Sequence, residues 1–375
     1  MENLVLYRKY RPQTFAEVAG QEHVIQTISN AVKSGRVSHA YLFTGPRGCG
    51  KTTTARILAK AVNCLSRKDG EAEPCGKCSS CLEIVNGRSM DLIEIDAASH
   101  RGIDDIRELR DGIKYVPSKS KYKVFIIDEC HQLSKDAANA LLKTLEEPPA
   151  HAIFVLATTE IHKMLPTILS RCQRFDFRKL KQEELVERLK KLAGLEKTKI
   201  EKAALELIAA SAGGSVRDAE SLLGQVFVFS GMKKETESIK AQDIREVLGI
   251  VEVKFIGEFI DLLIAKKAAE AVQFLNDIAD KGFDLQEFNK SAINYLRQGL
   301  IMSLTGLDAK GNTNLLVSGL TDEEYAKLLG QVQTLKTEKI RKIIELFLSA
   351  QEKIRYSPIP QLPLELAIIE ACDAG

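Results

Sequence analysis

Residues 45–52 read Gly-Pro-Arg-Gly-Cys-Gly-Lys-Thr and fit the phosphate-binding pattern G-x-x-x-x-G-K-[ST] at every defined position. An apolar run at 40–44 precedes this stretch directly, and a helical pattern over 53–61 follows it. In a strand, turn and helix of this order, backbone N–H groups of the turn face an anion at the helix N-terminus. Lys51 is placed to neutralise nucleotide phosphates and the Thr52 hydroxyl to bind Mg²⁺. The predicted nucleotide-binding residues of this loop are Gly45, Pro46, Gly48, Cys49, Gly50, Lys51, Thr52 and Thr53.

A second motif consists of Asp128 and Glu129, which follow the apolar run at 124–127. A carboxylate at the end of a buried strand can bind Mg²⁺, as we expect of Asp128, and Glu129 can polarise an attacking water. An acidic pair after a strand often simply begins a turn, so its meaning depends on the phosphate loop in the same sheet. Together the two motifs predict nucleotide hydrolysis rather than phosphate binding alone.

Four of the eight cysteines, Cys64, Cys75, Cys78 and Cys81, lie in a short span with the spacing C-x10-C-x2-C-x2-C. Four thiolates at this spacing suit a tetrahedral structural zinc site. A pair of disulfides is the rival interpretation, which a cytosolic compartment disfavours. Because four sulfur ligands leave no open coordination position, we predict a structural zinc module at about residues 62–84 and no catalytic zinc.

The first half of the chain alternates compact apolar runs with helical patterns. The runs lack polar alternation, as is typical of strands buried on both faces of a parallel sheet, and occupy residues 40–44, 92–95, 124–127 and 153–158. After about Phe177 the periodicity is helical only. We therefore predict an α/β domain at 1–178, a helical domain at 179–243 and an all-α domain at 244–375.

Composition limits how the chain can contact other molecules. The 375 residues are 45% apolar and 28% charged, which is ordinary for a globular protein, and 53 Lys+Arg oppose 51 Asp+Glu. A net charge of +2 excludes a protein that holds DNA by bulk electrostatics, so any DNA contact must be local. The basic excess is in residues 1–178, with 26 basic and 21 acidic side chains, whereas residues 244–375 carry 15 and 19. No apolar run approaches the roughly 20 residues of a membrane span, and no secretory signal is visible, so we expect a cytoplasmic protein without membrane contact.

Taken in order, these motifs resemble the AAA+ clamp-loader ATPases, and most closely the gamma/tau group of bacterial DNA polymerase III. The likeness covers essentially the whole chain and includes the N-terminal signature Tyr-Arg-Lys-Tyr-Arg-Pro at 7–12, followed by Phe15, Val18 and Gly20-Gln21. A four-cysteine insertion after the loop helix is characteristic of the gamma/tau group. The resemblance implies a P-loop AAA+ domain with a parallel sheet and a zinc-binding insertion, a helical lid that carries sensor 2, and an all-α oligomerising collar.

The same resemblance assigns roles to residues that would otherwise be interpreted as strand caps or surface charges. It implies that Tyr10, Arg11, Pro12 and Val18 lie at the adenine. Thr159, next to Thr158, matches the sensor-1 position, and Arg217 matches sensor 2. Arg171 in Ser-Arg-Cys matches the arginine finger that reaches the ATP of an adjacent subunit in trans. The segment at 96–102 matches the part of the family that faces DNA, with Arg101 and Lys143 as the candidate phosphate contacts.

The function that the resemblance implies is that of an ATP-driven motor subunit, which opens a sliding clamp and loads it on primer-template DNA. The implied cofactors are ATP, Mg²⁺ and structural Zn²⁺. The implied partners are the delta and delta-prime subunits, further gamma/tau copies, the beta sliding clamp and primer-template DNA. Two alternatives stay open. One is a translocating helicase or branch-migration motor, suggested by Asp-Glu-Cys-His at 128–131, and the other is a non-hydrolysing structural subunit of the same ring.

Overall fold

The computed structural model describes residues 5–99, 112–113, 115–230, 238–248, 252–305 and 322–373. It divides the chain into two compact units, Met1–Lys240 and Ala241–Gly375. The predicted three-domain division at 178 and 243 stays a prediction. No helix in the described ranges is long and apolar enough to cross a membrane.

A five-stranded parallel sheet with the order β2-β3-β4-β1-β5 forms the centre of the first unit. Its strands are β1 (Ala40–Thr44), β2 (Leu92–Asp96), β3 (Lys123–Asp128), β4 (Ala152–Thr158) and β5 (Gln173–Asp176). The four strands predicted from apolar runs are confirmed. Strand β5 was not predicted as one, because only Phe175 of its four residues is buried. Among the described residues it pairs only with β1, at the edge of the sheet, and its other side chains are exposed.

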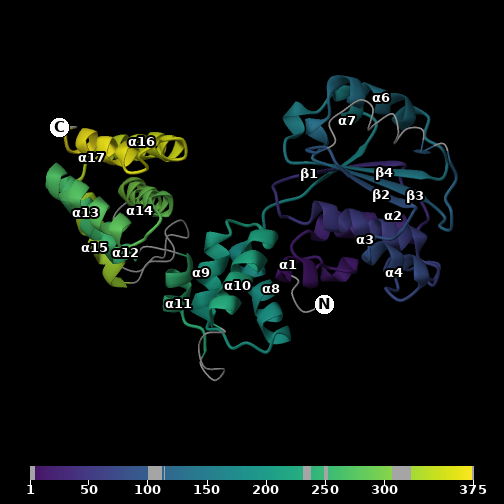
Figure 1. Ribbon diagram of the computed structural model, residues 1–375, viewed down its shortest axis with the longest axis horizontal. Coiled ribbons are helices and arrows are strands. Elements are labelled where there is room, and N and C mark those ends of the chain that lie inside the picture. Colours follow the sequence, from purple (N-terminus) through teal and green to yellow (C-terminus); the bar gives the residue numbers. More distant parts are fainter. Residues whose placement is uncertain are drawn as a thin grey trace. The chain divides into compact units, whose positions relative to one another are not determined.

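Helices cover both faces of this sheet, which explains the uninterrupted apolar runs. On one face lie α2 (Glu22–Lys33) and α3 (Lys51–Asn63), with α4 (Ser79–Val85) beyond them, and on the other lie α6 (Lys135–Glu146) and α7 (Pro166–Leu169) (Figure 1). Alternate side chains of β1 enter the two cores: Tyr41 and Phe43 pack toward α2 and α3, and Leu42 packs toward α6. Parallel strands all end at one edge of the sheet, so the residues that follow β1, β3 and β4 meet there.

In the described part of the first unit, β5 is followed by the helices α8 (Gln182–Leu195), α9 (Lys202–Ser211) and α10 (Val216–Ser230). Their buried residues include Leu189, Leu192, Ile208 and Leu223. The short N-terminal helix α1 (Leu6–Lys9) lies against α10 (Figure 1), and the side chain of Leu6 is 3.6 Å from where a Cβ on Gly224 would stand. Three single-turn 3₁₀ helices, η1 (Phe15–Glu17), η2 (Cys130–Gln132) and η3 (Ile161–Lys163), join elements of this unit.

The second unit is entirely helical in its described residues. It contains α11 (Ala241–Leu248), α12 (Val253–Ile264), α13 (Ala268–Asp280), α14 (Leu285–Thr305), α15 (Asp322–Thr334), α16 (Thr337–Ile354) and α17 (Leu362–Asp373). Phe259 lies at the centre of its core, with ring centroids 5.1 Å from Phe288 and 6.0 Å from Phe347. The predicted all-α region is confirmed.

Candidate active site at the edge of the parallel sheet

Backbone geometry makes glycine necessary in the loop between β1 and α3. Gly45, Gly48 and Gly50 have φ angles of +145°, +75° and +102°, which L side chains rarely adopt. A Cβ on Gly45 would stand 2.2 Å from the carbonyl oxygen of Phe177, and one on Gly48 would stand 2.1 Å from Ser215 Oγ. The loop therefore packs closely on two neighbouring segments while its N–H groups lie at the start of a 13-residue helix, an arrangement that favours anions.

Lys51 and Thr52 begin α3 and point back toward the sheet edge. The Lys51 ammonium donates hydrogen bonds to the carbonyl oxygens of Gly45 (2.7 Å) and Pro46 (2.8 Å), and the residue is only 6% exposed. The Thr52 hydroxyl donates to Asp128 Oδ2 at 2.6 Å. The two residues predicted to share a magnesium ion, which are 76 positions apart in the sequence, are thus in direct contact.

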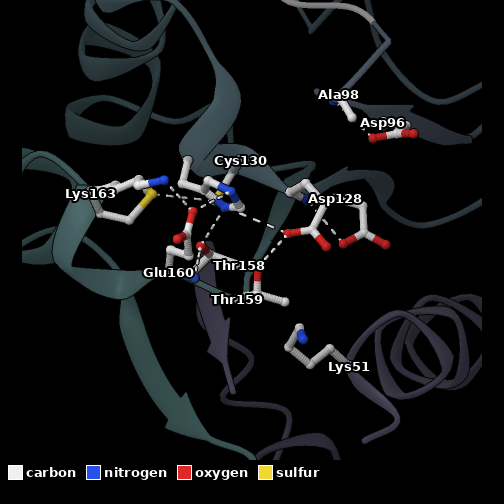
Figure 2. Close-up of polar contacts among 12 residues, drawn as sticks. Lys51, Asp96, Ala98, Asp128, Cys130, Thr158, Thr159, Glu160 and Lys163 are labelled. Atoms are coloured by element: carbon white, nitrogen blue, oxygen red, sulfur yellow. Dashed lines mark hydrogen bonds and ion pairs between the residues drawn. The ribbon is translucent and has the colours of Figure 1, made fainter. Parts of the chain in front are cut away.

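Glu129 lies beside Asp128, with its carboxylate held by the next strand. Thr159 follows β4, and its hydroxyl donates to Glu129 Oε2 at 3.0 Å (Figure 2). The backbone of Glu129 is left-handed, with φ +47°, and its N–H donates to Asp128 Oδ1 at 2.9 Å. Lys51, Asp128, Glu129 and Thr159 thus come from the ends of adjacent strands and from the loop, as the predicted parallel sheet requires.

A cavity of about 740 Å³ opens beside these groups. The predicted site residues that line it are Arg11, Pro12, Val18, Gly48, Cys49, Gly50, Lys51, Thr52, Thr53, Asp128, Glu129 and Arg217. Tyr10, Gly45, Pro46 and Thr159 are not part of the lining. Gly45 and Pro46 contribute the carbonyl groups that hold Lys51, and the carbonyl oxygen of Tyr10 accepts a hydrogen bond from Arg188 at 2.7 Å.

The start of α10 closes one side of the cavity. The Val216 N–H donates to the carbonyl oxygen of Gly48 at 3.1 Å, so this helix is attached directly to the phosphate-binding loop. The guanidinium of Arg217 lies 4.8 Å from the centroid of the Tyr7 ring and lowers the pKa of the Tyr7 hydroxyl through a hydrogen bond. Burial lowers the pKa of Arg11, with nearby Arg56 adding to the effect. The cavity therefore has several cationic groups in its wall.

Arg171 and the candidate DNA contact Lys143 lie outside this cavity lining. The guanidinium of Arg171 forms an ion pair with Glu146 and donates to the carbonyl oxygen of Thr167 at 2.7 Å. Lys143 is exposed on α6. Arg101 lies outside the described residues.

The four predicted zinc ligands lie together. The Sγ atoms of Cys64, Cys75, Cys78 and Cys81 are all within 4.8 Å of one another, and none of the eight cysteines forms a disulfide. Tetrahedral zinc–sulfur bonds of about 2.3 Å place sulfur atoms about 3.8 Å apart, so the cluster is close to that geometry. Backbone N–H groups of Lys77 and Cys78 lower the pKa of the Cys75 thiol to about 6, which favours the thiolate that binds metals. The four thiols can hold a metal ion.

Comparisons with known proteins match this arrangement along the whole chain. Three family models match successive parts: "DNA polymerase III, delta subunit" at 20–181, "DNA polymerase III clamp loader subunit, ATPase lid domain" at 184–232, and "DNA polymerase III subunits gamma and tau domain III" at 239–375. DNA polymerase III subunit gamma of Buchnera aphidicola is 33% identical over 100% of both chains. The chain belongs to the DNA polymerase III gamma/tau family.

Other gamma/tau relatives are longer. DNA polymerase III subunit tau of Bacillus subtilis is 41% identical over 100% of this chain and 64% of its own length. The Escherichia coli tau subunit is 37% identical over 99% of this chain and 55% of its own length. The present gamma/tau chain thus spans a little over half to about two thirds of the length of these tau relatives.

Sequence reasoning missed several polar residues around the cavity of this gamma/tau chain. Arg188 on α8 and Glu220 on α10 form an ion pair at 2.9 Å, with side chains 8% and 4% exposed, and burial raises the pKa of Glu220. Both line the cavity, as do Arg56 and Glu94, whose side chains pair through two 2.8 Å hydrogen bonds. One signal was available, because Arg188 stands three residues after Leu185 and thus on the apolar face of α8.

Proposed function

We propose that this chain is the ATP-driven motor subunit of the bacterial replicative clamp loader, which opens the sliding clamp and loads it on primer-template DNA. Membership of the gamma/tau family supports the assignment. The observation that carries the ATPase step is the contact between Thr52 Oγ1 and Asp128 Oδ2 at 2.6 Å, beside Lys51 and Glu129. A protein that had lost hydrolysis would not need this full set of groups.

The residues present fit ATP with Mg²⁺. A hydroxyl and a carboxylate oxygen already in contact are the oxygen ligands that Mg²⁺ takes beside substrate phosphates, so Thr52 and Asp128 would hold the ion. When bound, the ion neutralises charge that develops on the phosphates. The adenine would lie by Pro12 and Val18, which provide apolar surface in the cavity wall. Tyr10 supports this segment through its backbone contact with Arg188.

Four side chains of this chain would have separate roles in ATP hydrolysis. The Lys51 ammonium would leave the carbonyl oxygens of Gly45 and Pro46 and bind the β and γ phosphates. The Glu129 carboxylate would take a proton from the attacking water. The Thr159 hydroxyl, which bonds Glu129 at 3.0 Å, would orient that carboxylate or the water. Arg217, at the start of the helix attached to the loop, would bind the γ phosphate of the same chain.

Arg171 would act on the ATP of a neighbouring subunit. Its absence from the lining of its own chain's cavity, and its partly exposed position after α7, support action in trans. Hydrolysis would then depend on assembly with further gamma/tau copies and with the delta and delta-prime subunits. The beta sliding clamp and primer-template DNA complete the proposed partners, with Arg101 and Lys143 as proposed DNA contacts, and the assembly would work in the cytoplasm.

We propose that zinc holds the four-cysteine module together and takes no part in catalysis. Chelating the metal is expected to lower the melting temperature by several degrees and to change the ATPase rate of the still-folded protein little, because structural zinc contributes directly to folding free energy. Metal analysis and melting curves before and after chelation would measure this. The Cys75→Ser variant is the internal control, since its melting temperature should no longer respond to the chelator. A wild-type protein that contains zinc and melts unchanged without it would contradict the structural role.

The proposed function is tested by clamp loading itself. With ATP and the partner subunits, the wild-type chain should leave sliding clamps on circular primed DNA. The Glu129→Gln variant should leave few or no clamps on that DNA. Strand displacement by this chain alone, without clamp or partners, would instead favour the helicase or branch-migration alternative. Clamp loading that proceeds equally well with Glu129→Gln would favour a non-hydrolysing structural subunit.

A further inference from the structure

The imidazole of His131 lies buried at the centre of a group of polar side chains, with 6% of its side chain exposed. Its Nδ1 atom is 2.9 Å from Thr158 Oγ1 and 3.5 Å from Glu129 Oε2. On the other side of the ring, Nε2 is 3.2 Å from Glu160 Oε2. A histidine with three such neighbours is held in one orientation, and the proposed catalytic steps do not use it.

The backbone brings this side chain back toward the sheet edge. Glu129 follows β3 in a left-handed conformation, which is uncommon for a residue other than glycine and persists only when the surroundings hold it. The 3₁₀ turn η2 begins at the next residue, so His131 lies beside Glu129 rather than continuing the strand. The same turn therefore positions both the proposed base and the histidine.

In the neutral imidazole, the hydrogen-bond partners indicate the roles of the two ring nitrogens. A carboxylate oxygen only accepts, so Nε2 carries a hydrogen toward Glu160. In the neutral ring, Nδ1 is then an acceptor and receives the Thr158 hydroxyl hydrogen. The same Thr158 oxygen accepts the Glu160 N–H at 3.0 Å. His131 thus fixes the residues that follow β4, and with them the neighbouring Thr159 hydroxyl that bonds Glu129.

The polar contacts continue away from the site toward Arg171. Glu160 Oε2 also pairs with Lys163 Nζ at 2.6 Å, at the end of η3 (Figure 2). From Lys163 the chain runs through α7 to Arg171 within eight residues. Contacts from Glu129 through His131 and Glu160 to Lys163, followed by the chain itself, therefore join the carboxylate proposed to activate water with the segment proposed to serve the neighbouring ATP.

We propose that His131 is a positioning residue for hydrolysis. Through Thr158 it holds Thr159 and Glu129 in the arrangement that activates water, and through Glu160 it links that arrangement to the segment ending at Arg171. This inference rests on the proposed ATPase function and adds a residue to that site. His131 itself touches neither nucleotide nor water in this role.

Three substitutions at His131 separate its two contacts. Asparagine places an acceptor near Nδ1 and keeps the Thr158 contact, glutamine places a donor near Nε2 and keeps the Glu160 contact, and alanine removes both. His131→Ala and His131→Gln are expected to lower kcat for ATP in the assembled complex about ten-fold or more, because general-base catalysis as a whole contributes roughly 10²–10⁴-fold. His131→Asn should retain more of the wild-type kcat than either. KM and Kd for ATP should change less than about two-fold in all three, since a positioning residue acts on the transition state.

Two further variants test whether the loss of kcat in the His131 variants acts through Thr158. Thr158→Val should lower kcat as His131→Ala does, and the double variant should be no slower than either single one, because residues that act as a unit are not additive. His162→Ala is the matched control, an exposed histidine in η3 that should leave kcat unchanged.

ATP hydrolysis by the wild-type complex supports the proposed function, whereas the ratio of variant to wild-type kcat tests His131. Wild-type kcat in His131→Ala would overturn the inference, as would rescue by glutamine but not asparagine. Weakened ATP binding that accounts for the whole loss would equally overturn it, because that result indicates a structural role.

Discussion

Replacing Arg171 with alanine is expected to lower the ATPase rate of the assembled complex by about 10³–10⁵-fold, the range found for arginines that act in trans in nucleotide hydrolases. Loss of the guanidinium removes a positive charge that would stabilise the transferring phosphate of the adjacent subunit. ATP binding to the same chain should remain, since Arg171 does not line its own chain's cavity. Steady-state hydrolysis and equilibrium ATP binding, measured on the same preparation, separate the two effects.

A nearby arginine provides the control for this experiment. Arg174 is exposed and pairs with Asp176 at 2.8 Å on the edge strand, so Arg174→Ala removes a charge of the same kind three residues away. That variant should hydrolyse ATP within about two-fold of wild type, as expected for an exposed ion pair of little energetic value. An Arg171→Ala complex that keeps the wild-type rate would show that Arg171 is not the trans finger.

Replacing Lys51 with alanine is expected to abolish tight nucleotide binding. Lys51 is 6% exposed and the two present acceptors of its ammonium are loop carbonyl groups, so no other cation would take its place at the phosphates without rearrangement. Removing one partner of a buried charge pair costs about 3–5 kcal/mol, which corresponds to at least about 100-fold in Kd. Titration calorimetry with ATP and Mg²⁺ measures the loss directly.

The Lys51 experiment also needs a control for folding and total charge. Lys33→Ala removes an exposed lysine at the end of α2 and should leave Kd unchanged. The melting temperature of Lys51→Ala without nucleotide should stay close to wild type, which would confine the effect to binding. Tight ATP binding by a folded Lys51→Ala protein would contradict the phosphate-loop assignment.

The fold could be predicted where burial leaves a pattern in the sequence, either an unbroken apolar run or a helical period. The run at 40–44 is buried at every residue, and β1 has the bounds predicted from its apolar character. Strand β5 has one buried side chain, Phe175, and its sequence is otherwise that of an exposed loop. Most of the helical second unit follows from 3.6-residue periodicity, because α12 to α17 each bury one face against the core around Phe259.

The candidate site could be predicted where spacing in the sequence encodes chemistry. The loop at 45–52 and the pair Asp128–Glu129 are local patterns, and the parallel sheet brings them together because strands of one direction end at one edge. Arg188 and Glu220 could not be paired from the sequence, since 32 residues and a helix separate them. The role of His131 likewise depends on the left-handed turn at Glu129 and on the end of β4, which only the folded chain brings near it.

The most direct test of the central claim is the ATPase rate of this chain measured alone and then with primed DNA, sliding clamp and the other loader subunits, each singly and all together. The account predicts a low rate for the isolated chain, because Arg171 of one copy must reach the ATP of another. It predicts strong stimulation only when the full set is present. Strong stimulation by DNA alone, or no stimulation by the full set, would contradict the assignment as a clamp-loader motor.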